Sequence, residues 1–133
     1  MASNIVFVCL HGSAKSLIAA EYLTRRARER GVDAVGISRG TEPDAEVPAH
    51  VVQHMATKGF DLSSYVPKAA TATALEDADQ VITFGPDVSA LVPGGKAATS
   101  WAECPAVSDG FPPAWDFITH SVDGLLDHMP VAK

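Results

Sequence analysis

The sequence predicts an α/β domain in which a four-stranded parallel sheet carries helices on both faces. Two observations lead to this prediction. Short apolar segments typical of buried strands alternate along the chain with segments of helical periodicity, which is the pattern of parallel strands joined by helical crossovers. A length of 133 residues with 47% hydrophobic content fits one compact domain with a sizeable core.

The first strand and the first helix enclose a tight turn. Residues 4–8 form a short β-branched run of the kind that is buried on both faces of a parallel sheet. After a loop of small residues, the apolar positions of a helix follow, and Gly31 stands where a left-handed C-terminal cap is expected. The apolar positions at helical spacing are Leu17, Ala20, Leu23 and Ala27.

The later elements continue the alternation. Pro48 suits the first turn of a helix that ends at Lys58, before Gly59. Three prolines and a glycine make residues 104–113 a predicted loop. After the first helix we expect strand 32–38, helix 48–58, short helix 71–78, strand 80–84, short helix 86–92, strand 97–102 and a closing helix whose apolar face is Trp115, Ile118, Val122, Leu125, Leu126 and Met129.

Charge and composition exclude several classes of protein. The net charge of −6 argues against a nucleic-acid partner, and the basic run Arg25–Arg30 contains Glu29 and fits the solvated face of a helix. No stretch approaches the roughly 20 apolar residues of a membrane span, and no signal peptide is recognisable. Two cysteines far apart do not suggest a secreted disulfide scaffold, so we expect a cytoplasmic protein.

The loop from Leu10 to Lys15 is predicted to bind an anion. It follows the first strand, and in parallel sheets ligands bind beyond the carboxyl ends of the strands. A turn of small residues before a helix can direct backbone N–H groups and the helix dipole at one point, and the residues it would use are Leu10, His11, Gly12, Ser13, Ala14 and Lys15. The same donors, with the Ser16 hydroxyl, would stabilise a thiolate at Cys9. The competing interpretation is that Cys9 is a buried apolar residue, as most isolated cysteines are.

The stretch "VFVCLHGSAKSLIAAEYL" resembles the N-terminal signature of the low-molecular-weight protein tyrosine phosphatase family, which includes the thioredoxin-coupled arsenate reductases. That signature is an apolar strand, C-x5-R-[ST] and a helix. Further along, "ISRGT", "HMATKGFDLSSY" and "DQVITF" are similar to later segments of the family in the same order. The resemblance therefore implies one domain of that family, with its four-stranded sheet, over residues 1–133.

The resemblance also implies roles for matching residues. In the family the cysteine attacks phosphorus, the loop amides and the arginine bind the equatorial oxygens, and the hydroxyl after the arginine stabilises the thiolate. Cys9 and Ser16 match the cysteine and the hydroxyl, and His11 is similar to the residue found there in arsenate reductases. The implied ligands are phosphate, sulfate or another small oxyanion, with a phosphorylated protein as an alternative, and no cofactor.

Three positions depart from the family pattern. Lys15 replaces the arginine, and an ammonium lacks the planar fork that grips two oxygens, which implies a rate loss of at least about 10²- to 10³-fold. Gly12 replaces an asparagine that braces the loop. Cys104, before Pro105, replaces the aspartate that acts as general acid, and a thiol is a poor proton donor to a leaving oxygen.

These departures leave three interpretations open. The first is a divergent phosphatase with Cys9 as nucleophile, whose activity is weak or absent and whose acid is Glu103, Asp109 or none. The second is a binding or regulatory protein that keeps the anion pocket. The third is a thiol redox protein in which Cys9 and Cys104, placed face to face across the pocket by the resemblance, form a disulfide. The second pair of redox cysteines of thioredoxin-coupled reductases is missing after the third strand.

Four other side chains have weaker predictions. His50 and His54 lie one helical turn apart, but no third ligand is apparent, so we expect ordinary histidines and no metal. Trp101 could line the mouth of the pocket because it lies close before Cys104. For Tyr65, a place at the rim of the site and simple packing on its own loop both remain open.

Overall fold

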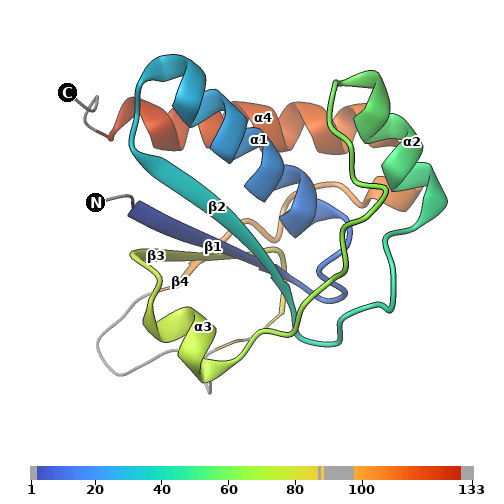
Figure 1. Ribbon diagram of the computed structural model, residues 1–133, viewed down its shortest axis with the longest axis horizontal. Helices are drawn as coiled ribbons and strands as arrows, with labels where there is room; N and C mark the ends of the chain where they lie inside the picture. Colours follow the sequence, from blue (N-terminus) through green and yellow to red (C-terminus); the bar gives the residue numbers. More distant parts are fainter. Residues whose placement is uncertain (1–2, 87, 89–97, 130–133) are drawn as a thin grey trace.

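The computed structural model describes residues 3–86, 88 and 98–129, and in them it contains a four-stranded parallel sheet with helices on both faces (Figure 1). The strands are β1 (Ser3–Cys9), β2 (Ala34–Gly40), β3 (Gln80–Thr83) and β4 (Ala98–Ser100). The helices are α1 (Lys15–Arg30), α2 (Ala49–Thr57), α3 (Ala72–Glu76), the 3-10 turn η1 (Val107–Asp109) and α4 (Phe111–Asp127). The predicted fold class is confirmed.

The strand order β2-β1-β3-β4 places β1 inside the sheet, with parallel neighbours on both sides. The chain runs from β1 outward to β2 and then crosses to β3 on the other side of β1. Strand order therefore reverses at β1, and the crevice at such a switch point is where ligands bind in open parallel sheets. Cys9, the last residue of β1, lies at that crevice opposite Gly40 of β2.

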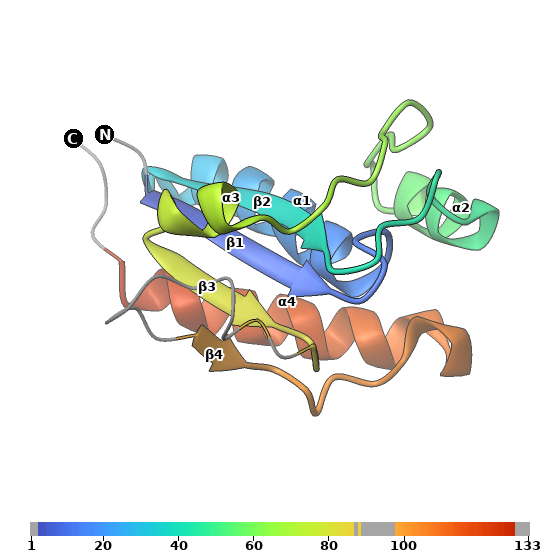
Figure 2. The same ribbon diagram turned by 90° about the horizontal axis from the view of Figure 1, so that it is seen from below.

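The two faces of β1 belong to different parts of the core. Ile5 and Phe7 pack in the larger apolar cluster, which α1 and α4 complete on one face. Val6 and Val8 pack in a smaller cluster on the other face, with Leu75 of α3. Figure 1 shows α1 and α4 together on one side of the sheet and α3 on the other, while α2 lies beyond the carboxyl ends of β1 and β2 (Figure 2). No helix in the described part of the chain is long and apolar enough to cross a membrane.

Two predicted boundaries are corrected by the structure. The loop predicted over residues 104–113 ends earlier, because α4 already begins at Phe111. Its first turn contains Pro112 and Pro113, which is permitted because the N–H groups of a first turn have no intrahelical acceptor. Pro48 is the N-cap of α2 and not part of its first turn. The short helix predicted over 86–92 lies, apart from residues 86 and 88, outside the described residues.

A Gly36→Ala substitution tests how closely α1 packs on β2. A Cβ added at Gly36 would lie 2.4 Å from the carbonyl oxygen of Ala20 in α1, so the helix would have to move off the sheet. We expect a loss of about 1–3 kcal/mol in the free energy of unfolding, measured by urea denaturation.

The matched control is Gly124→Ala in α4, where an added Cβ meets no atom within 4 Å. That substitution should stabilise the protein by about 0.5–1 kcal/mol, because alanine has the higher helix propensity. Equal effects of the two substitutions would contradict the close packing of α1 on Gly36.

Candidate functional site

The loop between β1 and α1 is held from outside by the segment that follows β2. Three backbone N–H groups of that segment donate to three successive carbonyls of the loop. The bonds run from Thr41 to Cys9 (3.2 Å), from Glu42 to Leu10 (2.7 Å) and from Asp44 to His11 (3.1 Å). Because these carbonyls point outward, the amides of the loop are directed to its inner side, as an anion cradle requires.

Gly12 lets this loop lie directly on the sheet. Its φ of 62° is in the left-handed region, and an added Cβ would be 2.7 Å from the backbone nitrogen of Gly40. A side chain therefore has no room at position 12. The glycine at this position, where the family pattern has an asparagine, thus has a physical reason. Direct contact between the backbones of Gly12 and Gly40 holds the loop in place of an asparagine side chain.

The thiol of Cys9 lies at the base of the loop and is 7% exposed. The backbone N–H of Gly12 donates to its Sγ at 3.2 Å, and the Oγ of Ser16 is 3.0 Å away. The N-cap of α1 is Ala14, whose side chain cannot cap the helix, so the positive end of the helix dipole is directed at the same place. The backbone donor, the hydroxyl and the helix dipole therefore converge on the sulfur.

A cavity of about 260 Å³ opens above Cys9. Its lining residues come from the β1–α1 loop, the β2–α2 segment, the end of β3 and η1, and they are Cys9, Leu10, His11, Ser13, Ala14, Lys15, Asp44, Pro48, His50, Phe84 and Val107. All the residues predicted to bind an oxyanion therefore line one cavity, with the exception of Gly12, which packs against the backbone of Gly40. Leu10, Phe84 and Val107 give it an apolar part.

Lys15 connects the loop to the segment before α4. Its Nζ donates to the backbone carbonyl of Cys104 at 3.1 Å, which leaves two of the three ammonium hydrogens for other acceptors. Burial raises the pKa of the Cys104 thiol, and the charge of Lys15 lowers it only in part, so Cys104 is a neutral thiol at neutral pH. Both cysteines are free.

The prediction that the Cys104 thiol faces Cys9 across the pocket stays a prediction: Cys104 is not among the residues that line the cavity, but both cysteines belong to the same apolar cluster. The backbone carbonyl of Cys104 accepts the hydrogen bond from Lys15, and its thiol donates to the carbonyl oxygen of Pro105 at 3.5 Å. The two candidate acids Glu103 and Asp109 are exposed and also lie outside the cavity lining.

Asp44 is a cavity carboxyl group that the sequence analysis missed. Its Oδ2 accepts a hydrogen bond from Ser13 Oγ at 2.7 Å, and its Oδ1 is 3.4 Å from Nδ1 of His11. The same Nδ1 is 3.0 Å from the carbonyl oxygen of Glu42, and because a carbonyl only accepts, Nδ1 carries a hydrogen. The sequence offered one indication of its place: Asp44 follows β2 at the same edge of the sheet at which β1 ends with Cys9.

The two histidines of α2 have different surroundings. His50 lines the cavity, whereas His54 stacks on Phe111 of α4 with a ring separation of 4.5 Å. Within the described residues, no three His, Cys, Asp or Glu side chains form a group that could hold a metal ion.

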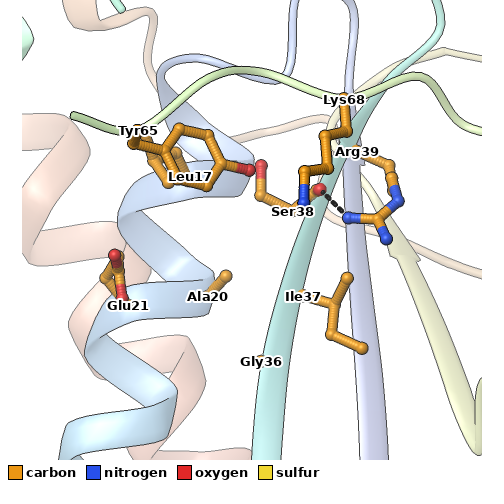
Figure 3. A pocket seen from close by; sticks show the side chains of 9 residues that line it. All are labelled: Leu17, Ala20, Glu21, Gly36, Ile37, Ser38, Arg39, Tyr65 and Lys68. Carbon is orange, nitrogen blue, oxygen red and sulfur yellow. Dashed lines mark hydrogen bonds between the residues drawn. The ribbon is translucent and has the colours of Figure 1, made fainter. Parts of the chain in front are cut away.

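The two aromatic candidates do not line the cavity of Cys9. Trp101 packs against Phe7 and Phe84, with ring centroids 5.7 Å and 5.8 Å apart, so it belongs to the core. Tyr65 lines a separate groove beside β2, which Figure 3 shows.

Comparison with known proteins identifies relatives of this site. The family model described as low molecular weight phosphotyrosine protein phosphatase matches residues 4–94, which is more than half of the chain. YfkJ from Bacillus subtilis superposes with a TM-score of 0.81 at 14% identity, covering 96% of this chain and 94% of its own. The tyrosine phosphatase Wzb from Escherichia coli K30, in complex with sulphate, superposes with a TM-score of 0.78 at 13% identity, covering 96% and 98%.

A third similar structure is the thioredoxin-dependent arsenate reductase Cg_ArsC1' of Corynebacterium glutamicum. Its TM-score is 0.76 at 23% identity, over 95% of this chain and 61% of that protein, so the present chain spans less than two thirds of its length. At these identities the three structures establish the fold.

The two thiols should differ in reactivity toward iodoacetamide. At about pH 8, we expect Cys9 to be alkylated first, because backbone and hydroxyl donors converge on its sulfur, whereas burial raises the pKa of the Cys104 thiol and keeps it neutral. Mass spectrometry of the two cysteine peptides measures the order of labelling.

In urea the two thiols should react at similar rates, which controls for differences in the peptides themselves. Faster alkylation of Cys104 than of Cys9 in the folded protein would contradict the description of the site.

Proposed function

Because the chain belongs to the low molecular weight phosphotyrosine protein phosphatase family, we propose that it binds a tetrahedral oxyanion such as phosphate or sulfate over Cys9 and hydrolyses phosphomonoesters slowly. The observation that carries the proposal is the position of the Cys9 sulfur, which receives the Gly12 N–H and lies beside the Ser16 hydroxyl at the base of the loop. The sulphate complex of E. coli K30 Wzb supports an oxyanion ligand in this fold.

In the proposed reaction the Cys9 thiolate attacks phosphorus and forms a sulfur–phosphorus bond as the bond to the ester oxygen breaks. The ester oxygen leaves with a proton as an alcohol or phenol. Water then attacks the cysteinyl phosphate, releasing inorganic phosphate and restoring the thiolate. The loop amides and the free hydrogens of Lys15 bind the oxygens of the phosphoryl group in both steps.

Two features of the site support slow turnover. Lys15 binds oxygens as a point charge and also holds the Cys104 carbonyl, so it cannot act as the bidentate ligand that an arginine would be. Cys104, at the position of the family's general acid, is a buried thiol outside the cavity. Three side chains of the cavity lining can carry a proton to the leaving oxygen: His50, and the pair His11 and Asp44, which lie 3.4 Å apart.

The shape of the cavity favours an aromatic ester. Leu10, 45% exposed, stands at the cavity together with Phe84 and Val107, so an aryl group could pack there while its phosphate enters the loop. We therefore propose an aryl phosphate as the substrate class, free or on a phosphorylated protein. We place the protein in the cytoplasm, where reducing conditions keep Cys9 a thiol.

A thiol redox function is the second candidate. Its support is the likeness to the arsenate reductase of C. glutamicum and the presence of both free thiols in one apolar cluster. Arsenate would bind as phosphate does, and its reduction to arsenite and water would take two electrons from Cys9 and Cys104, which become a disulfide. The buried position of Cys104 requires its loop to move first. Loss of two free thiols on addition of arsenate, measured with a thiol reagent, would favour this candidate.

Hydrolysis of p-nitrophenyl phosphate tests the proposed function. We expect slow turnover by the wild type that Cys9→Ser abolishes, and an increase of about 10²-fold for Lys15→Arg, because a guanidinium restores two oxygen contacts. Inorganic phosphate and sulfate should inhibit competitively.

A matched lysine-to-arginine substitution outside the cavity is the control. Lys68→Arg makes the same chemical change outside the cavity and should leave the rate unchanged. Turnover that survives Cys9→Ser would overturn the mechanism. If the protein binds phosphate but even a Lys15→Arg/Cys104→Asp variant shows no turnover, the protein is an oxyanion-binding protein and the proposed phosphatase activity is wrong.

A further inference from the structure

β2 is an edge strand, and the side of its backbone that faces away from β1 has no strand of the sheet beside it. The N–H of Thr41, one residue beyond β2, donates to the carbonyl of Cys9 at the end of β1. Because bonding to a parallel neighbour alternates along a strand, the odd-numbered residues of β2 bond to β1. The even-numbered residues therefore direct their N–H and C=O groups to the open side, and they are Ala34, Gly36, Ser38 and Gly40.

The chain covers this open side at two points only. The N–H of Gly36 donates to the hydroxyl of Thr24 in α1 at 2.9 Å. Gly40 exchanges two backbone hydrogen bonds, of 2.9 Å and 2.7 Å, with the segment 68–70, which runs parallel to β2 there. Between these contacts, the carbonyl of Gly36 and the N–H of Ser38 have no hydrogen-bond partner within the described part of the chain.

A groove of about 290 Å³ lies over this uncovered stretch of β2. Residues 36–39 of β2 line it, α1 forms one wall, and Tyr65 and Lys68 come from the segment after α2 (Figure 3). Ser38 is only 4% exposed, and a buried backbone N–H without a partner is rare in proteins. The groove therefore offers a ligand one backbone donor and one backbone acceptor of an open strand edge.

The end of the groove next to the segment 68–70 is positively charged. Arg39 and Lys68 line it, and Figure 3 shows both side chains beside Ser38. Arg39 donates one N–H to the carbonyl of Ser38 at 2.8 Å, which leaves the rest of the guanidinium for another acceptor. Among the described residues, neither cation forms an ion pair with an acidic side chain. This end of the groove therefore suits an anionic group.

The strand edge and the charge together specify the orientation of a ligand. One residue of a strand parallel to β2 would donate its N–H to the carbonyl of Gly36 and accept at its own carbonyl from the N–H of Ser38. Such a strand has to end there, because the segment 68–70 already occupies the position ahead of it. A chain that ends in this direction carries a carboxylate, which complements Arg39 and Lys68, whereas an antiparallel chain would bring its ammonium to the same cations.

We propose that this groove binds the carboxyl-terminal residue of a partner protein as a short strand parallel to β2. The N–H of that residue bonds to the Gly36 carbonyl, and its carboxylate accepts from the Ser38 N–H and pairs with Arg39 and Lys68. The groove shares no lining residue with the cavity over Cys9, so the inference does not depend on the proposed function.

The register also determines which side chains of the ligand fit. The last residue lies in register with Ile37, which packs against the smaller apolar cluster, so an apolar side chain is favoured there. The residue before it lies in register with Gly36, on the face that α1 covers, and Glu21 of α1 lines the groove at that side. A peptide that ends in lysine and valine therefore meets both conditions.

The test is fluorescence anisotropy of a fluorescein-labelled peptide, Gly-Ser-Gly-Lys-Val, titrated with the full chain. We expect saturable binding when the peptide has a free carboxylate. Amidation of the carboxylate should weaken binding at least about 10-fold, because it removes a charge-assisted hydrogen bond. Methylation of the valine nitrogen should weaken it at least about 3-fold, because it removes the N–H that bonds to the Gly36 carbonyl.

Variants of the protein show where the peptide binds. Lys68→Gln and Arg39→Gln should each weaken binding about 2- to 5-fold, as expected for exposed ion pairs, and the double variant about 10-fold. Lys58→Gln removes an exposed lysine outside the groove and should have no effect. Lys15→Gln removes the cation of the cavity over Cys9 and should also leave peptide binding unchanged.

Three results would overturn the proposal. The first is no saturable binding of the free-carboxylate peptide up to about 1 mM protein. The second is equal binding of the free, amidated and N-methylated peptides, or loss of affinity on amidation alone, which would indicate an anion site without strand pairing. The third is a loss of affinity in Lys15→Gln and not in Lys68→Gln, which would place the carboxylate over Cys9.

Peptide binding needs no turnover, so the two proposals fail separately. A protein without phosphatase activity that binds the carboxylate peptide through Lys68 keeps this inference and loses the proposed function. Hydrolysis of p-nitrophenyl phosphate without peptide binding has the opposite consequence.

Discussion

The contact between the backbones of Gly12 and Gly40 determines the geometry of the site. It is possible only because neither residue has a side chain, since a Cβ on either would lie 2.7 Å or less from the other's backbone. The approach lets the segment after β2 bind the outward carbonyls of the loop, which in turn directs the loop amides inward. The position of Cys9 at the floor of an anion cradle therefore depends on two glycines, one in the loop after β1 and one at the end of the neighbouring strand β2.

The charges around this cradle suit binding better than rapid turnover. Lys15 supplies a full positive charge, but part of its hydrogen-bonding capacity is used on the Cys104 carbonyl. Asp44, the carboxyl group in the cavity lining, accepts a hydrogen bond from Ser13 and lies 3.4 Å from Nδ1 of His11, so both of its oxygens already have partners on the loop. A phosphoryl group would meet donors on the loop side and no tuned carboxylic acid on the other, which accounts for the slow hydrolysis that we propose.

Much of this structure could be predicted from the sequence, because strands and helices leave local patterns. The β1 run, the small-residue loop and Ser16 occur within one short stretch, so their contact at Cys9 followed directly. The start of α4 was missed because Pro112 fits a loop and a first helical turn equally well. The place of Asp44 in the cavity depends on which strands are neighbours, and a single sequence contains no local pattern for strand order. The hydrogen bond from Lys15 to the Cys104 carbonyl was missed for a similar reason, since it joins residues that are distant in the sequence.

A crystal structure of the protein with orthovanadate tests the central claim most directly, because vanadate adopts the trigonal geometry of phosphoryl transfer. We expect vanadium bonded to Cys9 Sγ, its equatorial oxygens on the loop amides, and Lys15 Nζ within hydrogen-bonding distance of one of them. Vanadate bound elsewhere, or a loop whose amides do not contact it while Cys9 stays free, would contradict the assignment of this loop as an oxyanion site.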